Sequence, residues 1–151
     1  METTADTTSV RREVAIAASP ETVWEFLVDP DKAVRWMGVA ADLDPRPEGQ
    51  YRVEVLPGQV ARGEFVELDR PRRAVWTWGW DPGTRSALPP GASNVAIDLV
   101  PTDDGGTLVR LTHELPADEA APHDHGWQHY LARLAAAAGG EDPGEDPWLS
   151  R

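Results

Sequence analysis

Three tryptophans occupy every second position in one short stretch of the sequence, AVWTWGWDP at residues 74–82. This spacing is typical of a β-strand, and it places Trp76, Trp78 and Trp80 on one face of that strand. Indole rings offer wide apolar surfaces with one N–H donor each, which suits a planar, mostly apolar ligand. The alternative is that the rings simply fill the core. Three wide rings in a row leave gaps more readily than Leu or Val, which favours a cavity.

One of the four histidines is placed for proton chemistry. His113 shares a strand face with Val109 and Leu111, so we expect it to point toward the interior. Beside a cavity it would be the best-placed proton donor or acceptor, because the ordinary pKa of histidine lies near neutral pH. The hypothesis is that His113 hydrogen-bonds a polar end of a ligand. The alternative is a core histidine whose hydrogen bonds are satisfied.

Metal binding is the other chemistry that histidines suggest, because His125 and His129 lie four residues apart on an expected helix. That spacing can bring two imidazoles to one ion. A third ligand such as His113, His123 or Asp124 would be needed, and the HExxH pattern is absent. We therefore predict no metal. His123 and His125 are expected in water at the start of the helix, with His129 beside its apolar face.

Other catalytic patterns are missing from the sequence. Ser, His and Asp do not occur in a nucleophile-elbow context, no two carboxylates are spaced as an acid–base pair, and there is no phosphate-binding glycine loop. The absence of cysteine excludes disulfides and cysteine nucleophiles. We therefore predict no catalytic residue and no cofactor, and we expect a binding protein more than an enzyme.

Charge and length narrow the class of protein further. The net charge of −12 argues against nucleic acid and anionic membranes as partners. A chain of 151 residues is expected to form one domain. The polar N-terminus is not expected to act as a signal peptide, and no apolar run approaches the ~20 residues of a membrane span. These features predict a cytoplasmic location.

The elements that would position these residues follow from periodicity and turn signals. Ser19 and Pro20 are expected to start a helix that ends before Pro30, and a second short helix should run through Trp36. A long amphipathic helix begins near His123 and stops at Gly139-Gly140. Strands are expected at residues 11–18, 50–56, 60–68, 74–80, 94–100 and 107–115, although apolar residues fall on both faces of 60–68.

This order predicts an α+β fold, in which a curved antiparallel sheet of about six to seven strands grips the long C-terminal helix. Two short helices follow the first strand. The domain is expected to span residues 10–138, after a loose N-terminus at residues 1–9. Residues 139–151, GGEDPGEDPWLSR, are predicted to be a disordered acidic tail. Trp148 in this tail is either exposed or docked onto a partner or its own domain.

Four segments together are fairly specific for one known superfamily. They are ASPETVWEFLVDPDKAVRWMG, GEFVELDRPRRAVWTWGW, GGTLVRLTHELP and HDHGWQHYLARL, in this order between residues 18 and 134. The sequence resembles the START-like (SRPBCC, helix-grip) superfamily, and within it the branch related to the activator of the heat-shock chaperone ATPase. The resemblance implies the helix-grip fold and several possible activities: binding of apolar molecules, cyclase chemistry, or co-chaperone action.

We predict that the domain binds a small apolar or aromatic molecule in a cavity between the sheet and the C-terminal helix. Residues 81–93 and the short helix pair would form the entrance. The alternatives are a cyclase or hydrolase that uses His113 as acid or base in the same cavity, and an interaction domain for a protein partner or a second copy. The expected ligand-binding residues are Trp36, Tyr51, Trp76, Trp78, Trp80, His113, Trp127 and Tyr130.

Overall fold

The structure, a computed structural model, describes residues 6–83 and 88–150. The strands in this part of the chain are β1 (Thr7–Ile16), β2 (Ala40–Leu43), β3 (Gln50–Leu56), β4 (Gln59–Asp69), β5 (Arg73–Trp78), β6 (Ser93–Pro101) and β7 (Thr107–Pro116). The α-helices are α1 (Pro20–Val28), α2 (Pro30–Ala33) and α3 (Ala120–Ala138), and the short 3-10 helices are η1 (Ala117–Glu119) and η2 (Pro147–Ser150). The predicted α+β fold is confirmed.

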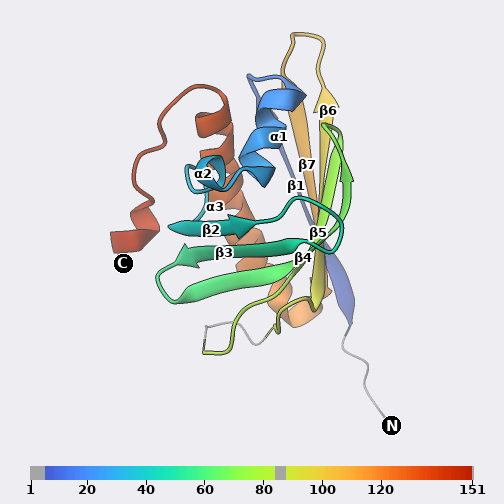
Figure 1. The fold of residues 1–151 in the computed structure, drawn as a ribbon, viewed down its shortest axis with the longest axis vertical. Coiled ribbons are helices and arrows are strands. Elements are labelled where there is room, and N and C mark those ends of the chain that lie inside the picture. Colours follow the sequence, from blue (N-terminus) through green and yellow to red (C-terminus); the bar gives the residue numbers. More distant parts are fainter. Residues whose placement is uncertain (1–5, 84–87, 151) are drawn as a thin grey trace.

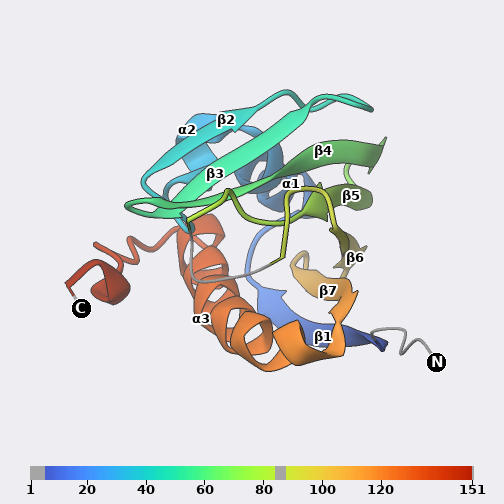
Figure 2. The same cartoon turned by 90° about the horizontal axis from the view of Figure 1, so that it is seen from below.

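The seven described strands form one antiparallel sheet in the order β1-β7-β6-β5-β4-β3-β2. The sheet curves strongly, so that β1 and β7 lie on one side of α3 and β2, β3 and β4 on the other (Figures 1 and 2). The helix thus lies within the curve, while α1 packs against α3 and β6. Within the described residues, no helix combines the length and the apolar character needed to cross a membrane.

The two short helices begin at the predicted caps. The Ser19 side chain accepts a hydrogen bond from the backbone of Thr22, and Asp29 ends α1 and caps α2. The second helix is shorter than expected, because α2 ends at Ala33 and not at Trp36. Trp36 lies buried after the helix, where its Nε1 donates to the Phe26 carbonyl at 2.8 Å.

Both ends of the domain extend further than the sequence analysis predicted. Strand β1 begins at Thr7, so residues 7–9 are not loose: Thr7 pairs with Pro116 and the ladder continues without a break to Ile16. Residues 1–5 of the expected loose segment lie outside the described residues. The acidic tail is also ordered from 139 to 149, since it turns back along α3 and buries Asp146 (Figure 1).

Two features of the sheet were not visible in the sequence pattern. Strand β2 is only four residues long, which is too short for alternation to show, and it pairs with β3 at the edge. Strand β4 has a register shift between Phe65 and Glu67 against β5. The bulge leaves Val66 half exposed, which explains why apolar residues appeared on both faces of this strand.

Close packing of β4 against β5 depends on Gly63. A Cβ atom at this position would lie 1.9 Å from the carbonyl oxygen of Thr77. We predict that Gly63→Ala lowers the free energy of unfolding by about 1–3 kcal/mol, because the backbone must move to admit the methyl group. Urea unfolding would measure this. The matched control is Gly126→Ala on α3, where no described atom outside the helix lies within 4 Å. This control should raise the free energy of unfolding by about 0.5–1 kcal/mol. If Gly63→Ala has the same free energy of unfolding as the unaltered protein, the packing argument is contradicted.

Candidate functional site

A cavity of about 620 Å³ lies between the β3–β4 hairpin, the end of β5 and the N-terminal half of α3. Polar groups reach it from Gln59, Glu119, His123 and His125. The volume falls within the ~300–1,000 Å³ range of small-molecule sites. The aromatic side chains around it are Trp78, Trp80, Trp127, Tyr130 and Trp148.

The predicted site residues divide into two groups in the structure. Trp78, Trp80, Trp127 and Tyr130 line the cavity. The other four lie behind this lining in the core: Trp36, Tyr51, Trp76 and His113.

The second group packs as an ordinary core. Tyr51 stacks on Trp76 with ring centroids 4.8 Å apart, and Phe65 lies edge-on to both. Burial raises the pKa of Tyr51 above its ordinary value. The tryptophan row is therefore core at the Trp76 end and cavity wall at the Trp80 end.

Trp80 reaches the cavity because the chain leaves the regular strand just before it. Strand β5 ends at Trp78, and Trp80 is held by an isolated bridge to Ala61. Gly79 passes so close to the 88–93 segment that a Cβ would lie 1.6 Å from the Pro89 carbonyl oxygen. The Trp80 ring then meets Trp78 edge to face at 5.4 Å.

His113 is a fully buried member of a hydrogen-bond chain that links the helix to the sheet. Its Nδ1 accepts from Trp127 Nε1 at 3.0 Å, and its Nε2 lies 2.8 Å from Ser93 Oγ. The Ser93 hydroxyl donates to the Trp78 carbonyl, so it must accept from His113 Nε2–H. The ring is thus a neutral imidazole with both nitrogens occupied. It matches the alternative of a satisfied core histidine.

His123 forms a second pairing of the same kind. Its Nε2 accepts from Trp80 Nε1 at 3.0 Å, and its Nδ1 donates to the Glu119 carbonyl at 2.8 Å. The prediction that His123 lies in water is wrong, because α3 begins at Ala120 and the His123 ring is turned inward, 8% exposed. The His113 and His123 rings meet at 5.2 Å and 90°.

Burial sets the charge of this histidine pair. Burial, and to a smaller extent the neighbouring His123, lowers the pKa of His113 to about 3. Burial also lowers the pKa of His123, although the Glu119 carbonyl and carboxylate oppose the shift. Both rings are neutral at neutral pH, and the nitrogens of each are already hydrogen-bonded.

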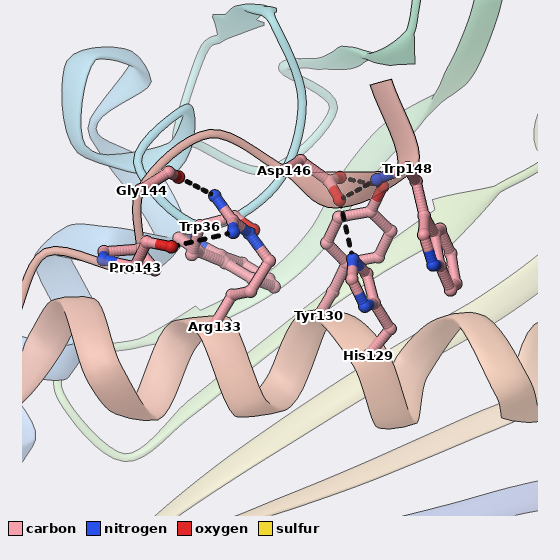
Figure 3. A network of polar contacts seen from close by, with 8 residues as sticks. All are labelled: Trp36, His129, Tyr130, Arg133, Pro143, Gly144, Asp146 and Trp148. Carbon is pink, nitrogen blue, oxygen red and sulfur yellow. Dashed lines mark hydrogen bonds and ion pairs between the residues drawn. The ribbon is translucent and has the colours of Figure 1, made fainter. Parts of the chain in front are cut away.

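Several lining residues were not predicted from the sequence, and two of them come from the tail. Trp148 and Leu149 complete the cavity wall. His129 does not simply lie beside the apolar face: its ring stacks on Trp148 at 3.7 Å and its Nε2 lies 2.8 Å from Asp146 Oδ1 (Figure 3). His125 is exposed, as expected. Two features of the sequence could have indicated that the tail packs on the domain. They are the lone Trp148 and Gly139-Gly140, which ends the helix and allows the chain to turn back.

Two further expectations concern metal ions and the entrance. Among the described residues, no group of three or more His, Cys, Asp or Glu side chains is placed to hold a metal ion. Of the expected entrance loop, residues 84–87 lie outside the described residues, and residues 81–83 and 88–93 do not line the cavity. Met37, which follows the short helix pair, does line it.

A curved antiparallel sheet around a C-terminal helix, with short helices after the first strand, defines a helix-grip domain of the SRPBCC type. Residues 17–139 match the family described as activator of Hsp90 ATPase homolog 1-like protein, and the chain belongs to this family. The resemblance seen in the sequence is confirmed. A search of the curated proteins gave no match.

Solved structures agree with this assignment. An AHSA1-like protein from Rhizobium etli is 44% identical with a TM-score of 0.75, over 100% of this chain and 94% of that one. CalU16 from Micromonospora echinospora is 24% identical, with a TM-score of 0.67 over 89% and 76% of the two chains. The Aha1 dimer from Colwellia psychrerythraea is 17% identical, with a TM-score of 0.72 over 88% and 98%. The last two show the fold alone.

The buried histidines predict that the fold is sensitive to acid. The folded-state pKa of His113 is about 3 against an ordinary 6.5, so the unfolded chain binds the proton more readily. The stabilisation is complete above about pH 6.5 and is lost as the pH falls toward 3, by about 1.4 kcal/mol per pH unit. His113→Gln should remove about this much of the slope in urea unfolding measured across that window. The variant still contains His123, so its free energy of unfolding keeps a smaller dependence on pH. Equal pH slopes in the unaltered protein and in His113→Gln would contradict the prediction.

Proposed function

We propose that this protein binds a small apolar or aromatic molecule in the cavity between the β3–β4 hairpin and α3. The observation that carries the proposal is the cavity itself, a space of about 620 Å³ with five aromatic side chains around it. Apolar ligand surface gains about 25 cal/mol per Å² on leaving water, and flat rings add stacking. The family has no single activity on this fold, so the proposal depends on the site.

The charge of the lining favours a neutral or cationic ligand. Glu119 is acidic, His123 in the lining and His113 behind it are neutral at neutral pH, and Lys and Arg are absent from the described lining residues. The net charge of −12 adds a field that repels anions. Cations are attracted to tryptophan faces, so an aromatic molecule that carries a protonated alkylamine would be accommodated.

The state of the histidines favours binding over acid–base catalysis. The enzyme alternative needs a second ionisable group beside His113, and His123 is there at 5.2 Å. Each ring nitrogen of the pair, however, is engaged by a tryptophan, a serine or a carbonyl group. A base must have a free lone pair within reach of the substrate. This pair therefore supports a structural role at the back of a binding site.

Gly126 offers a test that does not disturb the core. It lines the cavity on α3, and a side chain added there points into open space. We predict that Gly126→Leu fills part of the cavity and weakens binding of the neutral probe N-phenyl-1-naphthylamine by about tenfold or more. A fluorescence titration measures this. Gly126→Ala is the matched control and should bind the probe as the unaltered protein does.

Two results would count against the proposal. One is the absence of saturable probe binding by the unaltered protein. The other is equal affinity of Gly126→Leu and Gly126→Ala, which would place any bound probe outside the cavity. Because leucine is a good helix former, loss of binding through unfolding is not expected, and thermal unfolding of both variants checks this.

A further inference from the structure

The last part of the chain returns along α3 as a distinct segment, residues 141–149, which we term the C-terminal strap. Gly140 adopts a left-handed conformation (φ 94°), and the Glu141 N–H bonds back to the Ala136 carbonyl at 2.9 Å. The chain thereby reverses direction at the end of the helix (Figures 1 and 2). The strap pairs with no described strand, so its position depends on side-chain contacts.

The first contact is a clamp made by Arg133 of α3. Its Nη2 donates to the Gly144 carbonyl at 2.7 Å and its Nη1 to the Pro143 carbonyl at 3.4 Å, while its Nε donates to the Trp36 carbonyl at 3.1 Å. One guanidinium therefore ties the strap, α3 and the segment after α2 together (Figure 3). The clamp holds the near half of the strap and leaves the far half to a second contact.

That second contact is the carboxylate of Asp146, which is buried. Its Oδ1 accepts from His129 Nε2 at 2.8 Å and from the Trp148 backbone N–H at 3.0 Å, and its Oδ2 accepts from the Tyr130 hydroxyl at 2.7 Å (Figure 3). Burial by itself would raise the pKa of Asp146, but these three hydrogen bonds outweigh it and lower the pKa. A buried carboxylate without such donors would be strongly unfavourable.

Asp146 fixes the place of Trp148. The Trp148 ring stacks on His129 at 3.7 Å and 8°, lies 5.3 Å from the His125 ring, and meets Tyr130 edge-on at 5.5 Å. The same carboxylate thus holds the backbone of Trp148 and both the histidine and the tyrosine against which the indole packs. Trp148 and the adjacent Leu149 then face the cavity.

The other acidic residues of the strap do not share this environment. Glu141, Asp142 and Glu145 are exposed, and only Asp146 of the four carboxylates is buried. Solubility accounts for exposed acids but not for a carboxylate placed among three donors. The selective burial of Asp146 indicates a specific fastening, located where the strap meets the cavity.

We propose that the C-terminal strap is a removable wall of the ligand cavity, and that Asp146 is the positioning residue that fastens it by holding Trp148 in place. This inference rests on the proposed function. A segment held by a few side-chain contacts opens at a lower free-energy cost than the sheet and helix that it covers. Opening of the strap then admits and releases the ligand while the helix-grip core stays folded.

The test uses the full chain with Asp146→Asn, and Glu145→Gln as a control that removes the same charge from the neighbouring exposed position. Asparagine keeps the shape but presents an NH₂ group to one of the three donors. Stopped-flow fluorescence should show that N-phenyl-1-naphthylamine dissociates about tenfold faster from Asp146→Asn than from Glu145→Gln. The thermal midpoint, which reports the core, should be similar in the two variants.

Two readouts separate a positioning role from a merely structural one. Hydrogen exchange of the Trp148 amide, measured without probe, should be faster in Asp146→Asn and unchanged in Glu145→Gln. If Asp146 acts through Trp148, the double variant Asp146→Asn/Trp148→Ala should release the probe no faster than Trp148→Ala alone.

The possible failures are distinguishable. Unchanged amide exchange in Asp146→Asn overturns the fastening role, and faster exchange with unchanged probe rates overturns the role of the strap as a wall. If the unaltered protein binds no probe at all, the proposed function fails and the wall proposal fails with it, whereas the exchange experiment still decides whether Asp146 fastens the strap.

Discussion

The hydrogen bond from the Trp127 indole to the buried ring of His113 is the interaction on which the helix grip depends. It joins α3 to β7. The same imidazole donates to the Ser93 hydroxyl on β6, which in turn donates to the Trp78 carbonyl on β5. One chain of polar contacts therefore fixes the helix against three strands. It works only while His113 is neutral, because a protonated imidazole cannot accept from the indole. The low pKa of this residue is thus a condition of the architecture.

A second indole–imidazole pair, Trp80 with His123, explains why the interior is not solid beside the tryptophan row. Each pair orients its indole by a directional hydrogen bond, and the Trp78 ring lies between them, 5.4 Å from Trp80 and 5.1 Å from Trp127. Rings held in this way cannot rotate to fill adjacent space as flexible aliphatic side chains do. The cavity therefore persists between α3 and the β3–β4 hairpin.

Local periodicity was enough to predict most of the fold, and four of the eight predicted site residues line the cavity. The spacing of Trp76, Trp78 and Trp80 correctly indicated one face, since period two is a property of the backbone. It could not indicate that Tyr51 stacks on Trp76 and closes that end, because this contact depends on how β3 curves against β5. The tail was misjudged for a similar reason. Its composition predicts disorder, whereas the pairing of Asp146 with His129 joins residues 17 positions apart.

The two polar networks differ in a way that follows from their positions. The contacts of His113 lie behind the cavity and those of His123 lie in its wall, and both sets are neutral and held between strands and α3. At the strap, the Asp146 network contains a charged carboxylate and its histidine is partly exposed, so water can replace its bonds at a much smaller cost once the strap moves away. A binding site of this kind needs one rigid wall that defines its shape and one wall that can move to let the ligand enter and leave. The fold places the neutral network in the first wall and the exchangeable charged network in the second.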